Sequence, residues 1–141
     1  MNRVVIAGGG AAGFFAAGAC ARACARLGAR KEIVLLERGE AFLAKVRVSG
    51  GGRCNVTHAC ADPRDFAAHY PRGGRARLPA FQRFWPEETV EWFRQRGVRL
   101  KTEPDGRMFP VSDASATVID CFLREAREAG VILRTRRGVE H

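Results

Sequence analysis

The chain has 141 residues, 24 of them lysine or arginine and 15 aspartate or glutamate, and 46% of the residues are hydrophobic. This length fits one domain, and the balance of apolar and charged residues excludes disorder of the whole chain. No apolar run reaches the ~18 residues that a bilayer span needs. The first residues also lack the pattern of a signal peptide, so we expect a cytoplasmic protein without membrane contacts.

The formal charge of +9 comes almost entirely from arginine, since the only lysines are Lys31, Lys45 and Lys101. The arginines are scattered, and their densest cluster is the segment 134–137. A nucleic-acid-binding protein more often has a basic stripe with interleaved aromatic residues. We therefore predict no nucleic-acid partner and attribute the charge to an arginine-rich composition.

The cysteines are odd in number, and no pair has the CxxC spacing of a zinc or redox site. They are Cys20, Cys24, Cys54, Cys60 and Cys121. The first two belong to a tandem repeat of four residues within 19–26, which a duplicated helical turn explains. We predict structural thiols and no metal site.

The first elements along the chain are typical of a parallel βαβ unit covering residues 3–37. Residues 3–7 are predicted to form a buried strand, residues 8–10 a turn, and residues 11–27 an alanine-rich helix that ends at Gly28. Residues 33–36 form a second apolar run that ends at Glu37. Two continuous apolar strands joined by a helix indicate a parallel sheet with both faces covered.

The later elements are predicted with less regular spacing. The segment 38–80 is expected to be a loop that contains the second glycine loop, 45–58. The segment 80–111 is expected to form a helix from Pro86 to Gly97 and then a hairpin with its turn at 105–106. A helix over 113–129 capped by Ser112 and a strand over 131–139 are expected to follow. Because a Rossmann-type sheet has five or six strands, we interpret the chain as the N-terminal part of a longer protein.

Gly8, Gly10 and Gly13 fit the G-x-G-x-x-G pattern between a strand and a helix. In this motif the first glycine makes the tight turn, the second lets the backbone approach a pyrophosphate, and the third allows close helix–strand packing. Glu37 follows at the end of the second strand, about four residues later than the usual spacing of ~20. Its carboxylate is suited to the hydroxyls of an adenosine ribose. The pattern predicts dinucleotide binding.

A second glycine loop, Ser-Gly-Gly-Gly-Arg-Cys-Asn-Val-Thr at 49–57, follows soon after this acid. Three consecutive glycines cost backbone entropy and offer no side-chain contacts, so they suit a place where backbone lies against a flat ligand. Arg53 offers a permanent positive charge, and Asn55 both donates and accepts hydrogen bonds. This mixture is what a flavin ring requires.

Three motifs together resemble the YhiN/BaiN-type flavoproteins, also described as aminoacetone-oxidase-type or NAD(P)/FAD-dependent oxidoreductases. The motifs are the glycine fingerprint at 8–13, the second loop at 49–57, and Gly-Arg-Met-Phe-Pro-Val-Ser at 106–112. The resemblance covers almost the whole chain. It implies an α/β, Rossmann-like FAD-binding domain of the glutathione-reductase type, here truncated, with an inserted β-rich domain and C-terminal strands that this chain does not contain.

The resemblance also implies roles for individual residues. It implies that the FAD pyrophosphate binds at Gly8, Gly10, Ala12 and Gly13, and that the adenosine ribose binds at Glu37 with Arg38 beside it. The ribityl chain and flavin would lie along Lys45, Ser49, Gly50, Gly51, Gly52, Arg53, Cys54 and Asn55. The adenine would meet the backbone of Val139. Two positions depart from the family pattern. Leu43-Ala44-Lys45 replaces the usual Gly-Lys-Lys, and Thr57-His58 replaces Thr-Asn.

The leading hypothesis is an FAD-dependent oxidoreductase that relays hydride between NAD(P)H or oxygen and an unidentified organic substrate. An NAD(P)-only dehydrogenase would leave the second glycine loop unexplained. A truncated, non-catalytic remnant or dinucleotide-binding module is the remaining alternative, and the chain alone is expected to be poorly stable and inactive. No catalytic acid or base is nominated, because His58, His69 and His141 all fall in predicted loops or at the end. The oligomeric state stays open.

Overall fold

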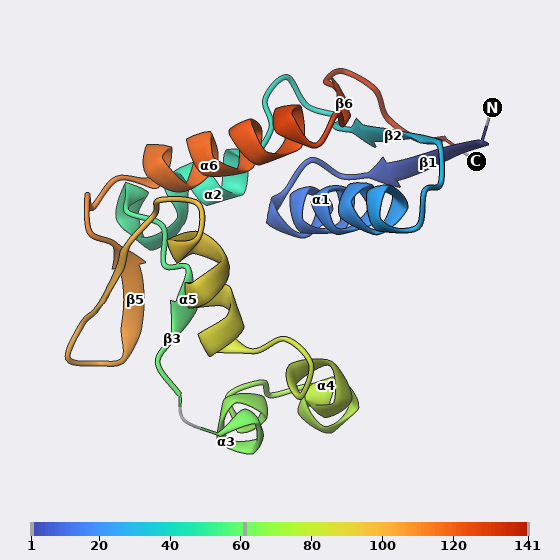
Figure 1. Ribbon diagram of the computed structural model, residues 1–141. Coiled ribbons are helices and arrows are strands. Elements are labelled where there is room, and N and C mark those ends of the chain that lie inside the picture. Colours follow the sequence, from blue (N-terminus) through green and yellow to red (C-terminus); the bar gives the residue numbers. More distant parts are fainter. Residues whose placement is uncertain (1, 61, 141) are drawn as a thin grey trace.

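The computed structural model describes residues 2–60 and 62–140. Its elements form two small sheets and several helices (Figure 1). In chain order they are β1 (Asn2–Ala7), α1 (Ala11–Arg26), β2 (Lys31–Leu36), α2 (Ala44–Val48), the 3-10 turn η1 (Ser49–Gly52), β3 (Thr57–His58), α3 (Pro63–Ala68), α4 (Gly74–Phe81), α5 (Pro86–Arg94), β4 (Leu100–Thr102), β5 (Arg107–Pro110), α6 (Ser115–Glu128) and β6 (Ile132–Arg134).

The first sheet is parallel and has the order β1-β2-β6. Val4 lies opposite Ile33 in the β1–β2 pair, and Val34 lies opposite Ile132 in the β2–β6 pair. Each parallel neighbour requires a crossover, which α1 makes between β1 and β2. The predicted βαβ unit and parallel α/β fold are therefore confirmed.

The prediction that the first strand is buried is wrong. β1 lies at the edge of the sheet within the described residues, and Val5 is 51% exposed. β2 instead has a neighbour on each side, and Ile33, Val34 and Leu35 are buried. Strand order decides this difference, because both strands are apolar runs of similar length.

The core forms where α1, β2 and α6 meet. Phe14 and Phe122 are buried, and their ring centroids lie 5.9 Å apart. Phe15 of α1 adds an edge-to-face contact with Phe122 at 5.2 Å. α6 presents Val118 to the same cluster, so its apolar face fixes the helix across α1. This core holds the start of α1 in place beneath the first glycine loop.

The second sheet is antiparallel and has the order β3-β5-β4. The predicted hairpin corresponds to β4 and β5, in which Lys101 lies opposite Phe109. β3 comes from the end of the second glycine loop and pairs Thr57 with Met108. The hairpin therefore anchors the second glycine loop, although about 50 residues of chain separate them.

Three expectations about the later elements are wrong. The segment 38–80 is not a continuous loop, because it contains α2, η1, β3, α3 and α4. Ser112 does not cap α6, since Ala114 is the N-cap residue and the left-handed Asp113 (φ 54°) lies between them. The final strand covers only Ile132–Arg134 instead of 131–139.

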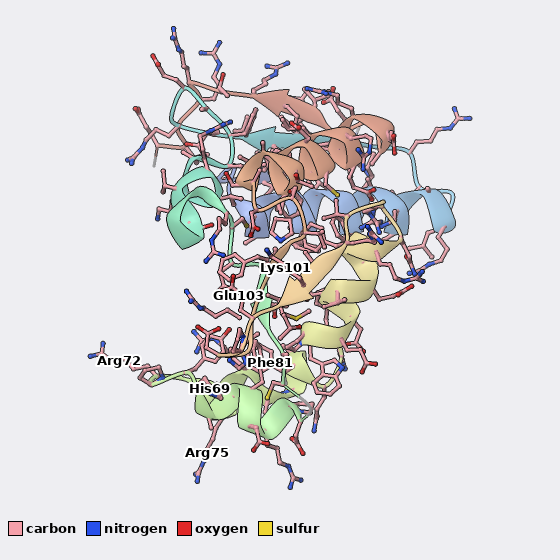
Figure 2. All side chains as sticks on the ribbon, turned by 90° about the vertical axis from the view of Figure 1, so that its left-hand side faces the viewer. His69, Arg72, Arg75, Phe81, Lys101 and Glu103 are labelled. Carbon is pink, nitrogen blue, oxygen red and sulfur yellow. The ribbon has the colours of Figure 1, made fainter. Side chains whose placement is uncertain are left out.

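The helices α3 and α4 lie side by side at the end of the molecule away from the parallel sheet (Figure 1), and residues 62–84 are called the α3–α4 unit below. Asp62 caps α3 by accepting a hydrogen bond from the Arg64 backbone at 2.6 Å, and proline follows at the first helical position. In Figure 2, Arg72 and Arg75 extend from this unit, on the far side from Lys101 and Glu103 of the hairpin region. None of the described helices is long and apolar enough to cross a membrane.

Candidate dinucleotide-binding site

The first glycine loop connects β1 to α1 through a tight turn. Gly8 has φ +106° and donates its backbone N–H to Leu36 O at 2.8 Å. A Cβ atom added to Gly13 would overlap the carbonyl oxygen of Gly8 and lie 3.1 Å from Leu35 Cδ1. Only hydrogen fits at that position, so Gly13 allows the close packing that the motif predicts.

Gly10 is the N-cap of α1, and the space beside its Cα atom is open. The first turn of α1 contains no acidic side chain, and no side chain caps the helix. The first N–H groups of a helix have no partner within it, and the helix dipole adds partial positive charge there. Ala12 is exposed at the same end. The start of α1 can therefore bind an anion such as a phosphate.

Glu37 joins the first glycine loop to the turn after β2. Its Oε2 accepts the Gly9 backbone N–H at 2.9 Å, and its Oε1 accepts the Gly39 N–H at 2.7 Å. The hydrogen bond from Gly39, followed by that from Gly9, lowers the pKa of the Glu37 carboxyl. The carboxylate is thus held ionised at the end of β2, beside the start of α1.

Phe42 and Leu43 pack against Gly9, a contact that the sequence analysis did not predict. Leu43 donates its backbone N–H to Gly9 O at 2.8 Å. A Cβ atom on Gly9 would overlap the Phe42 ring and lie 2.9 Å from Glu37 Cβ. The sequence did contain a signal for this contact, because the fingerprint requires only two of the three consecutive glycines at 8–10 and Gly9 is the additional one.

Leu43 adopts a left-handed conformation with φ 59° and ψ 27° as the N-cap of α2. Its side chain is only 1% exposed and packs in the main core. In the family pattern described above, the usual residue at this position is glycine, which adopts such angles without steric cost. Leu43 therefore combines backbone strain with apolar burial.

The second glycine loop consists largely of residues with positive φ. Gly50, Gly51 and Gly52 have φ values of 55°, 68° and 85°, and Cys54 follows with 63°. A Cβ atom on Gly50 would lie 2.8 Å from both Asn55 N and Phe109 Cε1, whereas nothing lies within 4 Å of one on Gly51 or Gly52. The loop is closed by a hydrogen bond from Cys54 N to Ser49 O at 3.0 Å. One side of the loop therefore faces open space.

Arg53 points toward the hairpin. Its guanidinium pairs with Glu103, lies 3.6 Å from Asp113 Oδ1 and sits 4.0 Å above the Phe109 ring. The hydrogen bond to Glu103 raises the pKa of Arg53 further. The Asn55 amide also turns toward the backbone, donating to Thr57 O at 2.9 Å. These contacts hold the second glycine loop against the hairpin region.

A cavity of about 450 Å³ lies between the two glycine loops. Six residues predicted from the sequence line it: Gly10, Ala12, Lys45, Ser49, Cys54 and Asn55. The remaining wall consists of Ala11, Phe15, Val46, Val56, Thr89, Phe93, Val118 and Phe122. Burial in this wall raises the pKa of the Cys54 thiol. The contribution of α5 and α6 was missed, because their contact with the loops depends on the tertiary fold.

The other predicted residues are not among those that line the cavity. They are Gly8, Gly13, Glu37, Arg38, Gly50, Gly51, Gly52, Arg53 and Val139. The chain after β6 runs beside the end of β2, where Arg137 donates its backbone N–H to Glu37 O at 2.9 Å. Val139 follows two residues later and is 67% exposed. It lies beyond β6 rather than within a strand.

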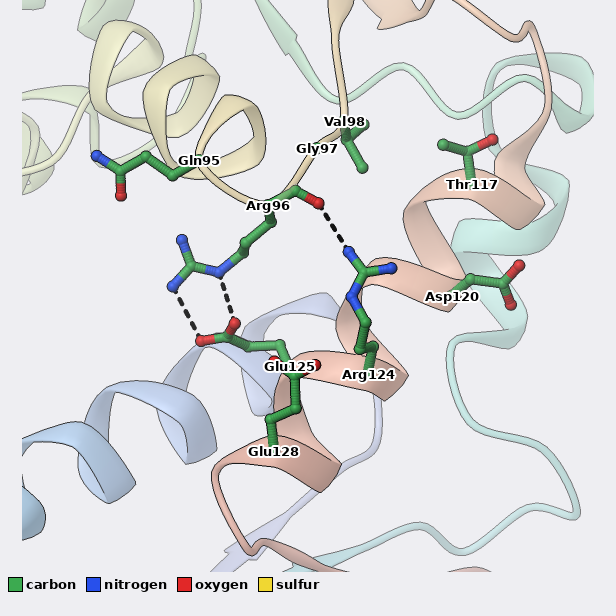
Figure 3. Close-up of a pocket in the computed structure, with 9 residues that line it drawn as sticks. All are labelled: Gln95, Arg96, Gly97, Val98, Thr117, Asp120, Arg124, Glu125 and Glu128. Carbon is green, nitrogen blue, oxygen red and sulfur yellow. Dashed lines mark hydrogen bonds and ion pairs between the residues drawn. The ribbon is translucent and has the colours of Figure 1, made fainter.

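A larger groove of about 830 Å³ lies between α5 and α6 (Figure 3). Two of its side chains are paired, because Arg96 makes two hydrogen bonds to Glu125, at 2.7 and 2.9 Å, and Arg124 donates to Arg96 O at 2.7 Å. Glu125 also pairs with Arg22 of α1. These contacts tie α1 and α6 to the end of α5, and none of the residues lining the groove belongs to either glycine loop, so the larger volume does not make it the candidate site.

The parallel sheet, the glycine turn and the free start of α1 define a Rossmann-type dinucleotide-binding domain. The sequence matches the family described as "HI0933-like protein Rossmann domain" over residues 2–141. The chain belongs to this family of oxidoreductases, and the resemblance drawn from the motifs is confirmed.

Two curated relatives illustrate the range of the family. The chain is 34% identical over 140 residues to a 3-dehydro-bile acid delta(4,6)-reductase of Clostridium scindens, covering 99% of this chain and 32% of that protein. It is 26% identical over 135 residues to a ribosomal RNA dihydrouridine synthase of Escherichia coli, covering 96% of this chain and 31% of that protein. The chain thus spans about a third of the length of these relatives.

Proposed function

We propose that this chain forms the FAD-binding part of a flavin-dependent oxidoreductase. The observation that carries the proposal is the cavity that joins the start of α1 to the second glycine loop. Its volume of about 450 Å³ lies in the range of small-molecule sites, and its wall is mostly apolar with a few polar groups. Binding of a nicotinamide nucleotide alone would not explain the second glycine loop.

The residues present fit the two halves of FAD. The N–H groups at the start of α1 would hold the pyrophosphate, and Lys45, which lines the same cavity, would lie along the ribityl chain. Glu37 would accept hydrogen bonds from the adenosine ribose, since its carboxylate is already ionised and oriented by Gly9 and Gly39. Val139, next to this region, would meet the adenine through its backbone.

The flavin half would lie along the second loop. The open side of Gly51 and Gly52 admits a flat ring, and the apolar wall formed by Phe93, Val118 and Phe122 excludes water from one side. Ser49 and Asn55 supply polar contacts at the edge of the cavity. FAD, when bound, would supply hydride transfer, while the chain binds and orients it.

The activity of the whole protein is proposed as hydride relay between NAD(P)H or oxygen and an organic substrate. One relative is named as a reductase, and another is named for making dihydrouridine. Both names are consistent with a reduction.

The test uses the full-length protein purified without added cofactor. Oxidised-flavin absorption, with FAD recovered after denaturation, is the expected result. Ala12→Asp should abolish FAD binding, because a carboxylate at the start of α1 would repel the pyrophosphate. Ala16→Asp, one turn further along the same exposed side of α1, is the matched control and should keep FAD.

Two outcomes would contradict the proposal. A folded, colourless protein that takes up no added FAD would exclude flavin binding. Equal FAD affinities of the Ala12→Asp and Ala16→Asp variants would show that the pyrophosphate does not lie at the start of α1.

A further inference from the structure

Six charged side chains form a continuous series of ion pairs beside the second glycine loop. Positive and negative groups alternate along the series, in the order Lys101, Asp113, Arg53, Glu103, Arg107 and Asp105. Arg53 belongs to the loop, and the other five come from the segment 101–113, which contains the hairpin. Figure 2 shows Lys101 and Glu103 between the α3–α4 unit and the parallel sheet. The six charges cancel, although the whole chain has a formal charge of +9.

The Arg53 guanidinium is held by two carboxylates and an aromatic ring. It pairs with Glu103, lies 3.6 Å from Asp113 Oδ1 and sits 4.0 Å above the Phe109 ring. Phe109 is fully buried and also packs against the backbone of the loop, because a Cβ atom on Gly50 would lie 2.8 Å from its Cε1 atom. Of the two carboxylates, Glu103 makes the closer contact, so it is the main anchor of this guanidinium.

The cavity between the two glycine loops receives none of this charge. Among the described residues that line it, Lys45 is the only charged one, and no member of the ion-pair series is included. Cys54, which directly follows Arg53, does line the cavity. The Arg53 side chain therefore begins one residue away from the cavity and turns toward the hairpin instead. A long arginine side chain has many rotamers, so this direction requires a partner that fixes it.

We propose that Glu103 is a positioning residue, which holds the Arg53 guanidinium on the hairpin side of the second glycine loop and keeps its positive charge away from the flavin. This inference rests on the proposed function, because it requires FAD in the cavity. A cation beside a flavin favours the reduced form, which carries more negative charge, and the attraction is strong where water is excluded. Keeping the cation away lowers the reduction potential, which makes the reduced flavin a better hydride donor to an organic substrate.

The test measures the midpoint potential of FAD bound to the full-length protein, by reductive titration with a reference dye. Glu103→Ala leaves Arg53 only the longer contact with Asp113, so the guanidinium is free to turn toward the flavin and the potential should become more positive. The preference for reduced over oxidised FAD should rise about tenfold, which is about 30 mV for a two-electron couple. Glu103→Asp keeps a carboxylate and should stay closer to the wild type.

Two double variants separate a movement of Arg53 from a general change in charge. Arg53→Met/Glu103→Ala and Arg107→Met/Glu103→Ala each remove one positive and one negative charge, and both arginines lie next to Glu103. If Glu103 acts through Arg53, the first double variant should return to the wild-type potential and the second should keep the shift. A shift that is reversed in both double variants, or in neither, would overturn the inference.

The outcome also distinguishes this inference from the proposed function. A folded wild-type protein that binds no FAD would overturn both, whereas a Glu103→Ala protein with normal FAD content and an unshifted potential would overturn the inference alone. Urea denaturation shows whether the variants stay folded. If the alanine variant is unstable, Glu103→Gln replaces it: its amide oxygen still accepts a hydrogen bond, so it should give a smaller shift in the same direction. No shift in the glutamine variant would then count against the inference.

Discussion

The two glycine loops use glycine for different physical reasons. In the first loop Gly9 and Gly13 are required by space, because a Cβ atom on either would overlap neighbouring atoms. In the second loop Gly51 and Gly52 are required by conformation, since both have positive φ while nothing lies within 4 Å of an added Cβ. The first loop is therefore a packed joint between elements. The second is a shaped surface with one open side, as expected where a ligand supplies the missing contacts.

The largest effect is expected for Gly13→Ala, which tests the packed loop. The new methyl group would meet the backbone of Gly8, and backbone cannot move aside as a flexible side chain can. We expect a loss of about 3 kcal/mol or more in the free energy of unfolding, measured by urea denaturation of the full-length protein.

Gly18→Ala is the matched control within the same helix. Its added Cβ would meet only the Arg22 side chain, at 3.4 Å, an ordinary contact distance. Because alanine favours a helix interior over glycine, this variant should be unchanged or more stable by up to about 1 kcal/mol. Equal destabilisation of the two variants would show that the contact between Gly13 and Gly8 does not constrain the loop.

The next effect concerns Leu43, where strain and burial oppose each other. Leu43→Ala removes a buried side chain and keeps the left-handed backbone, so it should cost about 2–5 kcal/mol. Leu43→Gly removes the same packing but relieves a strain of about 1–2 kcal/mol. The glycine variant should therefore be the more stable of the two by urea denaturation, the reverse of the usual order for helical positions. An alanine variant as stable as the glycine variant would argue against strain.

A smaller loss of stability is expected for Gly51→Val, which tests the open loop. A β-branched residue at φ 68° should cost about 1–3 kcal/mol and leave the helix content intact by circular dichroism. FAD binding should be abolished, because the side chain would occupy the open side of the loop. Gly97→Val is the control: Gly97 has φ 78° and the same open space, but it lies outside both loops. It should lose similar stability and keep flavin, and a Gly51→Val protein with normal flavin content would contradict the assignment.

Local pattern was sufficient for the parts of the site that adjacent residues make. The apolar runs of β1 and β2, the alanine-rich α1 and the glycine fingerprint all act within a few residues, so the βαβ unit could be predicted. The tandem repeat in 19–26 simply lengthens α1, which ends at Arg26 before the left-handed Gly28. The predicted contacts of these residues with FAD stay predictions.

Contacts between distant residues explain what the sequence analysis missed. Phe42 and Leu43 hold Gly9 from more than thirty positions away, and Arg53 is paired with Glu103 across the hairpin. No local periodicity encodes such contacts. The helices α3 and α4 were missed because they are short and α4 contains Pro79, which usually argues against a helix interior. The Asp-Pro pair at 62–63 was the signal for the start of α3.

The smallest effect is expected for Glu37→Gln, which tests the link between the first glycine loop and the turn after β2. The hydrogen bonds from Gly39 and Gly9 lower the pKa of Glu37 in the folded protein, so folding favours the ionised carboxylate. The stabilisation is therefore fully present above the unfolded pKa of about 4.3 and is lost as pH falls through the lower folded value. Urea denaturation at neutral pH should show the glutamine variant to be less stable than the wild type. The difference should shrink below about pH 4, where the wild-type carboxyl becomes protonated. A difference that stayed constant with pH would mean that Glu37 acts through its shape alone, and that its charge does not hold the first loop.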